Sequence, residues 1–164
     1  MTSPRLNHRL RALLAMLPDA GSIADVGAGH GALAVHLALR GAATVIATEA
    51  ARGPYDELCH NLDWWGARER VEPRFGANLD PMASGEVEAV VAAGMGARNL
   101  LSICEGAAGR GVRWVALQCI QDAELIDPWL DAHAWRVVGQ DVAVDRGHNY
   151  PTWIAQVRRV EAAA

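Results

Sequence analysis

The stretch Ser22-Ile-Ala-Asp-Val-Gly-Ala-Gly-His-Gly31 decides the fold of this chain. Its first half is a short apolar run typical of a buried strand, and its second half is a glycine-rich turn. Residues 31–40 follow as a predicted helix that ends at Gly41. A glycine turn between a strand and a helix lets a ligand approach the backbone, where side chains would otherwise collide with it. The stretch therefore predicts the first strand–turn–helix unit of a ligand-binding α/β sheet.

The same alternation of strands and helices continues along the chain. Apolar runs predict further strands at residues 44–49, 71–75, 87–93 and 113–118. Helices are predicted at residues 5–17, 53–66, 96–108 and 122–133. Two β-rich runs at 135–144 and 150–159 close the chain as a hairpin, with a turn at 145–149.

This order of elements predicts an α/β, Rossmann-like doubly wound sheet that is mostly parallel, with one antiparallel C-terminal strand. Pro73 favours an edge position for the strand at 71–75. We expect a single domain over residues 1–164, with an N-terminal helix in 1–18 and the Rossmann-like core in 19–160. The tail at 161–164 is expected to fray.

Composition narrows the possible classes of protein. The chain has 164 residues, 51% apolar and 21% charged, and no apolar stretch as long as the roughly 18 residues of a membrane span. Its 3 cysteines are widely spaced and show no zinc-binding pattern, so neither a disulfide framework nor a metal site is expected. With no signal-peptide pattern at the N-terminus, we expect a cytoplasmic protein. The net charge of −4 gives no general support to nucleic-acid binding.

Two cofactor classes fit the glycine turn, the nicotinamide dinucleotides and S-adenosylmethionine. Asp25 lies inside an apolar strand, where a carboxylate is costly to bury unless it meets a cation or hydrogen-bond donors. The methionine ammonium of S-adenosylmethionine would supply them, whereas a pyrophosphate would be repelled. Glycines at 27, 29 and 31 make the turn more open than binding of a phosphate requires. Glu49, at the end of the second strand, can accept both ribose hydroxyls in either case. These features favour S-adenosylmethionine.

Several short motifs then resemble the bacterial tRNA adenine-N1 methyltransferases of the TrmK type, over roughly residues 5–158. The most specific are Glu49…Gly53-Pro54-Tyr55 after the second strand and Gly94-Met95-Gly96 after the fourth. Others that fit in order are Leu6-Asn-His-Arg9-Leu10, Asp25-Val-Gly27…His30, Leu117-Gln118, Trp129-Leu130 and Asn149-Tyr150.

The resemblance implies a class I methyltransferase sheet whose seventh strand is antiparallel. It implies that S-adenosylmethionine lies at the carboxyl ends of the first four strands and that Met95 lines the pocket where the substrate meets the methyl group. The expected cofactor-binding residues are Asp25, Gly27, Gly29, Gly31, Glu49, Ala50, Ala77, Asn78 and Gly94.

The chain also departs from the family pattern. Gly29 replaces an acid of the family's Ser-Asp-His, and Ala77-Asn78 replaces the Asp-Gly that follows the third strand. Cys119-Ile120 replaces the Pro-Asn of Leu-Gln-Pro-Asn. The family's C-terminal helical segment has no counterpart in these 164 residues.

The expected catalytic candidates are His30, Tyr55, Met95 and Gln118. His30 could orient the substrate or take a proton, or could cap the first core helix. Tyr55 could instead be a packing residue, and Gln118 could hydrogen-bond a base edge or be a satisfied strand-end amide. Arg5, Arg9 and Arg11 could contact RNA phosphates, or form a solvated helix face.

The favoured interpretation is an S-adenosylmethionine-dependent methyltransferase that acts in tRNA processing, by N-methylation of adenine in tRNA. Methyl transfer from a sulfonium is an in-line displacement, so no metal, covalent intermediate or catalytic triad is required. A methyltransferase for a small molecule or a protein stays open as an alternative, as does a non-catalytic cofactor-binding partner. The sequence also leaves an oligomer or a partner subunit open.

Overall fold

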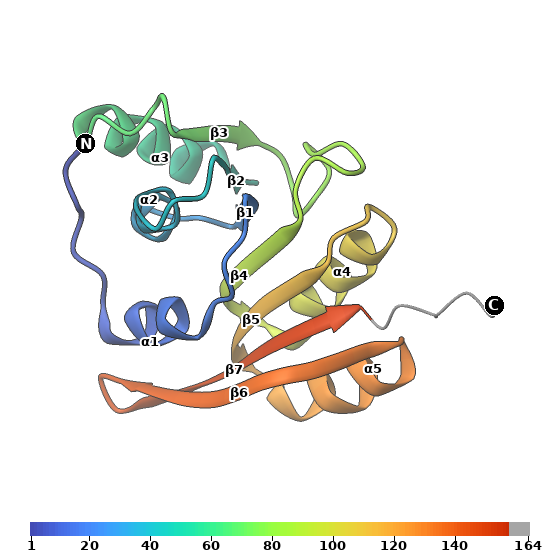
Figure 1. Cartoon of the computed structure of the whole chain (residues 1–164). Helices are drawn as coiled ribbons and strands as arrows, with labels where there is room; N and C mark the ends of the chain where they lie inside the picture. Colours follow the sequence, from blue (N-terminus) through green and yellow to red (C-terminus); the bar gives the residue numbers. More distant parts are fainter. Residues whose placement is uncertain (158–164) are drawn as a thin grey trace.

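The computed structural model describes residues 1–157, so the predicted tail at 161–164 and the end of the last β-rich run lie outside the described residues. One seven-stranded sheet has the order β3-β2-β1-β4-β5-β7-β6 (Figure 1). The strands are β1 Ser22–Val26, β2 Thr44–Glu49, β3 Val71–Phe75, β4 Ala89–Gly96, β5 Trp114–Gln121, β6 Trp135–Asp145 and β7 His148–Val157. The third strand lies at one edge of the sheet, as its proline predicts.

The predicted fold class is confirmed. Strands β1 to β5 pair in parallel, and β7 runs antiparallel to both of its neighbours, β5 and β6. The β6–β7 turn is tighter than predicted, because Asp145 and His148 still pair across the hairpin. Its two central residues, Arg146 and Gly147, have φ values of 50° and 79°. Positive φ at both positions is typical of the type I′ turn, whose twist matches that of the strands.

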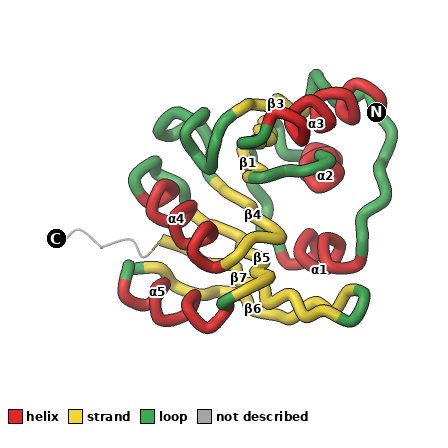
Figure 2. The backbone as a smooth tube through the Cα atoms, turned by 180° about the vertical axis from the view of Figure 1, so that it is seen from behind, coloured by secondary structure: helices red, strands yellow, loops and turns green. Residues whose placement is uncertain are grey.

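Helices cover both faces of the sheet. They are α1 His8–Met16, α2 Ala32–Leu39, α3 Arg52–Trp64, α4 Ala97–Ala108 and α5 Ile126–Ala132. Leucines of α1, α2 and α3 belong to one buried cluster with side chains of β1, β2 and β4. Apolar residues of α4 and α5 belong to a second cluster with β4, β5 and β7, on the other face (Figures 1 and 2).

Several predicted boundaries differ from the structure. The first helix begins at His8 rather than at residue 5, because the Asn7 side chain accepts the Leu10 N–H and caps it. The helix predicted at 122–133 is a short 3₁₀ turn, Ala123–Leu125, followed by α5. The fourth strand continues through residue 96, past its predicted end at 93, with irregular pairing to β5 at that end.

The N-terminal segment, residues 1–7, runs from the end of α3 past α2 to the start of α1 (Figure 1). Thr2 N–H donates to the Trp65 carbonyl at 2.8 Å, and His36 Nε2 lies 2.7 Å from the Pro4 carbonyl. These contacts hold α1 beside the sheet, where Arg9 reaches the carboxyl ends of β4 and β5. Within residues 1–157, no helix is long and apolar enough to cross a membrane.

Candidate functional site

The glycine turn lies at the carboxyl end of β1, where chain connections leave in opposite directions toward β2 and β4. Gly27, Gly29 and Gly31 have φ values of 67°, 55° and 83°, a region that side-chain-bearing residues rarely adopt. The Ala28 N–H donates to the Thr48 carbonyl at 3.0 Å, which ties the turn to β2. A Cβ built on Gly29 would meet no atom within 4 Å, so the backbone at this point is open to a ligand.

Asp25 is buried on β1 directly before this turn, with 2% of its surface exposed. Its Oδ2 atom has no hydrogen-bond partner among the described residues. The pKa of this carboxyl group is raised from 3.8 to about 7. Burial is the main cause and the charge of Glu49 adds to it, while the Ala34 amide and the charge of Arg9 act in the opposite direction. An unpaired, buried acid beside a second acid is the arrangement that a bound cation would stabilise.

Glu49 ends β2 and faces the turn from the neighbouring strand. Its Oε1 atom accepts the Gly29 N–H at 2.8 Å, so the carboxylate fixes the middle of the turn. Glu49 is half-buried, and Ala50, which follows it, is exposed. A carboxylate here keeps its second oxygen available for a ligand hydroxyl.

The loop after β3 lies beside the end of β2. The Gly76 N–H donates to the Glu49 carbonyl at 2.9 Å, and the Thr48 hydroxyl donates to the Asn78 carbonyl at 3.3 Å. Ala77 is exposed, and Asn78 adopts a left-handed φ of 49°. The structure therefore brings together Glu49, Ala50, Ala77 and Asn78, the predicted cofactor residues of β2 and β3.

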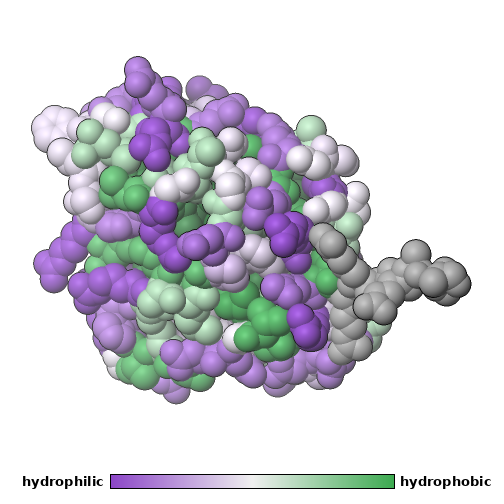
Figure 3. Space-filling view, in the orientation of Figure 1, coloured by the Kyte–Doolittle hydropathy of each residue, from purple (hydrophilic) through white to green (hydrophobic). Residues whose placement is uncertain are grey.

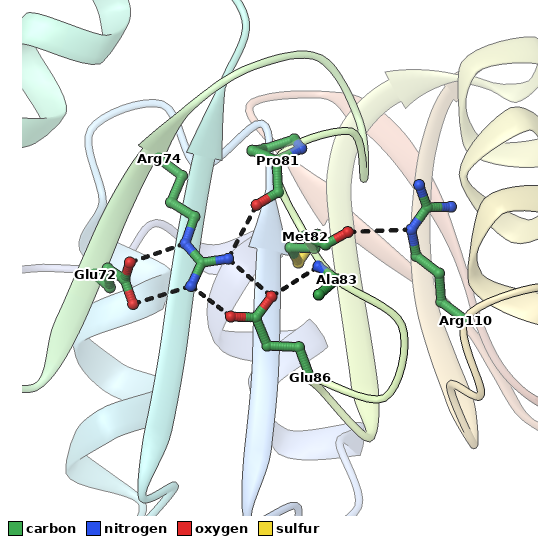
Figure 4. A network of polar contacts seen from close by, with 7 residues as sticks. All are labelled: Glu72, Arg74, Pro81, Met82, Ala83, Glu86 and Arg110. Atoms are coloured by element: carbon green, nitrogen blue, oxygen red, sulfur yellow. Dashed lines mark hydrogen bonds and ion pairs between the residues drawn. The ribbon is translucent and has the colours of Figure 1, made fainter.

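A network of charged groups holds this loop in place (Figure 4). Arg74 of β3 donates to Glu86 Oε2 at 2.8 Å, to the Pro81 carbonyl at 2.9 Å and to Glu72 Oε1 at 2.9 Å. Glu86 also accepts the Ala83 N–H at 2.8 Å. The Arg74 guanidinium and this amide lower the pKa of Glu86 from 4.5 to about 2. The network therefore ties the second half of the loop, at Pro81, Ala83 and Glu86, to the edge strand.

Replacing Glu86 with glutamine is expected to lower the free energy of unfolding at pH 7 by about 2 kcal/mol, because a paired and largely covered charge is lost. Glu86 has a lowered pKa in the folded state, so its stabilising effect is present above about pH 4.5 and is lost as the pH falls toward 2. Urea unfolding between pH 3 and 7 checks this.

The matched control is Glu72→Gln, since Glu72 pairs with the same arginine but has 59% of its side chain exposed. It is expected to change stability by less than about 1 kcal/mol. Equal effects of the two variants, or a Glu86 effect that does not shrink in acid, would contradict this account of the loop.

Gly94 and Met95 lie at the end of β4, next to the turn. A Cβ at Gly27 would collide with the Met95 methyl group, so this methionine lies directly over the first glycine. Asn99 of α4 donates to the Met95 sulfur at 3.5 Å. Gly94 has a φ of 78° and lies under the guanidinium of Arg9, whose Nη2 would be 3.3 Å from a Cβ at this position. The predicted neighbours Asp25, Gly27, Gly94 and Met95 thus share one small region.

Gln118 agrees with one of its two predicted alternatives, a satisfied strand amide, and its main partner is Arg9. Gln118 is completely buried at 0% exposure. Its Oε1 accepts from Arg9 Nη1 at 2.8 Å, and its Nε2 donates to the Arg9 carbonyl at 3.0 Å and to the Thr152 hydroxyl at 3.2 Å. The Arg9 guanidinium also lies 5.2 Å from the centre of the Tyr150 ring. Gln118 therefore holds Arg9, and Arg9 points inward, unlike the exposed Arg5 and Arg11.

His30 and Tyr55 lie on the outer side of the turn. His30 Nδ1 is 2.9 Å from Glu57 Oε1, and 77% of the histidine side chain is exposed. Tyr55 meets Phe75 edge to face, with ring centres 5.5 Å apart, and the Arg52 guanidinium lies within 6 Å of both rings. Sequence reasoning missed Arg52 and Phe75, although Phe75 pairs with Glu49 across β2 and β3 and so ends at the same edge.

Two hollows lie outside this region. One lies at the amino ends of β1 and β2, lined by Leu17, Pro18, Asp19, Ala20, Gly21, Ile23, Leu37, Arg40, Gly41 and Ala42. The other lies between α1 and α2, lined by Leu6, Arg11, Leu14, Ala15, His36 and Arg40. Figure 3 shows patches of apolar surface among polar groups on one face of the molecule. Neither hollow includes the glycine turn, where Met95 lies over Gly27 and Gly29 stays open.

Comparisons with known proteins agree with this geometry. The sequence profile of a family described as "Methyltransferase domain" matches residues 6–152. The tRNA (adenine(22)-N(1))-methyltransferase of Bacillus subtilis (strain 168) is 25% identical over 166 residues, which cover 99% of this chain and 70% of that protein.

Solved structures share the fold. The B. subtilis m1A22 tRNA methyltransferase TrmK superposes with a TM-score of 0.84 and 24% identity, over 93% of this chain and 67% of that one. Streptococcus pneumoniae Sp1610, a putative tRNA (m1A22) methyltransferase in complex with S-adenosyl-L-methionine, superposes with a TM-score of 0.88 and 24% identity, over 98% of this chain and 77% of that one. M. capricolum TrmK, in complex with S-adenosyl-homocysteine, superposes with a TM-score of 0.82 and 16% identity, over 94% of this chain and 69% of that one.

The predicted enzyme class is confirmed by the matching domain family, and the predicted resemblance by the agreement in sequence and fold over nearly the whole chain. The chain belongs to the methyltransferase-domain family, as a distant relative of the TrmK-type tRNA methyltransferases.

Proposed function

We propose that this chain binds S-adenosylmethionine at the glycine turn and transfers its methyl group to a ring nitrogen of adenine in tRNA. The observation that carries the proposal is Asp25, a buried carboxylate with an unpartnered oxygen beside a second carboxylate. S-adenosylmethionine carries a net positive charge, which would stabilise the ionised forms of these two acids. Relatives with the same fold are described in complex with this cofactor or its product.

The proposed contacts follow the carboxyl edge of the sheet. Asp25 would meet the ammonium of the methionine end, and the free oxygen of Glu49 would accept ribose hydroxyls. The backbone of the turn would lie against the ligand at Gly29, where no side chain stands in the way. Ala77 and Asn78 would flank the adenine ring. Met95 is long and flexible, and we expect it to move from its place over Gly27 when the ligand binds.

When bound, S-adenosylmethionine supplies an activated methyl group, so the protein mainly has to align the acceptor nitrogen and exclude water. The N1 atom of adenine has a lone pair available for attack and needs no prior deprotonation. Gly94 and Met95 lie where the acceptor would approach. His30 is exposed at the turn and paired with Glu57, where it would orient the substrate.

The tRNA assignment rests on the B. subtilis relative and on surface features near the turn. Phe75 is 49% exposed beside Tyr55 and Arg52, a combination on which a nucleobase could stack. Arg5 and Arg11 are exposed on the N-terminal segment and α1, and could contact phosphates.

The test is transfer of a labelled methyl group into total tRNA, total small RNA and a metabolite extract, followed by digestion and identification of the methylated nucleoside. We expect label in tRNA as 1-methyladenosine, and none with the Asp25→Asn variant. Label in the metabolite fraction alone would replace tRNA with a small-molecule substrate. Cofactor binding with no label in any fraction would favour a non-catalytic partner protein.

A further inference from the structure

Two aromatic rings and an arginine lie together where β3 ends and α3 begins. The rings of Tyr55 and Phe75 meet edge to face, with their centres 5.5 Å apart. The Arg52 Cζ atom lies 5.9 Å from the centre of the tyrosine ring and 5.8 Å from that of the phenylalanine ring. These three side chains form an aromatic platform with a cation beside it.

The aromatic platform is open to solvent. Phe75 is 49% exposed, and β3 is an edge strand, so no strand lies on its outer side. The segment that leads from β2 into α3 contains Ala50, Ala51 and Gly53, which are all exposed. A Cβ at Gly53 would meet no atom of the described residues within 4 Å. Small neighbours therefore leave room for a flat ring to stack on the platform.

The platform lies at the same edge of the sheet as the glycine turn. Phe75 pairs with Glu49 across β2 and β3, and Glu49 accepts the Gly29 N–H. In the proposed function the acceptor base approaches Gly94 and Met95 at the end of β4. The order β3-β2-β1-β4 separates β3 from β4 by three strand spacings, or about 14 Å. The platform is therefore too far from the methyl group to hold the base that is methylated.

The charges around the platform favour a nucleobase over a phosphate. Arg52 Nε lies 3.2 Å from Asp56 Oδ1, so an ion pair already balances the arginine charge. Stacking of a base on an aromatic ring or a guanidinium plane requires no net positive charge, because every base has a π face. The net charge of −4 is also more compatible with contacts to bases than with contacts to phosphates alone.

We propose that the aromatic platform stacks a tRNA nucleobase other than the methylated adenine and so positions the substrate. This inference rests on the proposed function. A separation of about 14 Å equals roughly four steps of a stacked strand at 3.4 Å each, and fewer steps of an extended one. The stacked base is therefore expected roughly two to four nucleotides from the methylated adenine.

Substitution of Phe75 tests the stacking by kinetics. In Phe75→Leu, which keeps the apolar bulk and loses the flat ring, kcat/KM for tRNA is expected to fall about tenfold or more, mainly through a higher KM. Phe75→Tyr keeps the ring and should stay within about threefold of the wild type. Both variants should bind S-adenosylhomocysteine within about twofold of the wild-type affinity, because the ring does not contact the cofactor.

Trp64→Ala is the matched control. Trp64 is an aromatic residue with 78% of its surface exposed, at the opposite end of α3. Its loss should leave kcat/KM for tRNA within about twofold of the wild type. Photo-cross-linking locates the base directly: p-benzoylphenylalanine at position 75 should label tRNA roughly two to four nucleotides from the 1-methyladenosine, as mapped by sequencing.

Full activity of Phe75→Leu, or a cross-link to the methylated adenine itself, would overturn this inference and leave the proposed function standing. An equal loss of affinity for S-adenosylhomocysteine would also overturn it, since the ring would then belong to the cofactor site. Wild-type protein that transfers no methyl group to tRNA would overturn the proposed function, and this inference with it.

Discussion

Replacing Asp25 with asparagine is expected to weaken binding of S-adenosylhomocysteine by at least about 100-fold, or 2.7 kcal/mol. The reason is that the variant cannot pair a charge with the ligand ammonium in a site that excludes water. Calorimetric titration measures the affinity, and circular dichroism checks that the fold is kept. Retained affinity within about tenfold would show that Asp25 does not meet the ligand.

The same substitution is expected to stabilise the ligand-free protein. A rise in the pKa of Asp25 from 3.8 to about 7 corresponds to a penalty of about 4 kcal/mol for keeping the ionised group in the fold at pH 8. Because this folded-state pKa is raised for an acid, the penalty is absent below about pH 4, grows as the pH rises to 7, and is constant above. Burial of the asparagine amide offsets part of the gain, so we expect the free energy of unfolding to rise by about 2 kcal/mol at pH 8.

Urea unfolding at pH 4 and pH 8 separates this pH-dependent change in stability from one that is independent of pH. The advantage of Asp25→Asn should be present at pH 8 and close to zero at pH 4. Glu105→Gln, at an exposed position on α4, is the control and should show no comparable gain. A variant that is less stable than the wild type at pH 8 would mean that the buried carboxylate is already satisfied in the ligand-free protein.

Ligand binding should also be linked to a proton. If the cation binds only to ionised Asp25, its affinity falls about tenfold per pH unit below 7, and binding releases a proton in that range. Titrations in buffers with different ionisation enthalpies count that proton directly. An affinity that does not change between pH 5 and 7 would contradict the raised pKa or the proposed contact.

The core of the candidate site could be predicted from sequence because its residues follow one another closely along the chain and are unusual for the strands and turns in which they lie. Asp25 is an acid in an apolar strand, and the glycines follow it directly. Glu49 ends the next strand, and parallel neighbours end at the same edge. Each of these positions is determined by strand order alone, so a correct fold class was enough to place them.

Arg9 and Gln118 could not be placed in this way, since they are 109 residues apart and meet only in the folded chain. The direction of Arg9 depends on how the N-terminal segment holds α1 beside the sheet, which no helical periodicity encodes. The resemblance placed Met95 at this edge, but only the folded structure shows that its side chain lies over Gly27.

Replacing Glu49 with alanine is expected to weaken S-adenosylhomocysteine binding by about 100-fold, while Glu49→Gln should cost only about tenfold. The alanine variant loses the acceptor for the Gly29 N–H, so the turn itself is released, together with the proposed ribose contact. Glutamine can keep the first bond through its amide oxygen but presents a donor where the carboxylate presented an acceptor.

The ribose contact can be isolated with an analogue of S-adenosylhomocysteine that lacks the 2′-hydroxyl. The affinity of the wild-type protein should fall about tenfold when the 2′-hydroxyl is removed, and that of Glu49→Gln should fall much less. The two losses of affinity are therefore not additive if Glu49 contacts this hydroxyl. Additive losses of affinity would show that Glu49 does not contact the ribose. In Glu49→Gln, moreover, the pH dependence of binding should shift downward, because the charge of Glu49 contributes to the raised pKa of Asp25. That shift would show that the charge of Glu49 acts on Asp25, which ionises more easily once its neighbour is neutral.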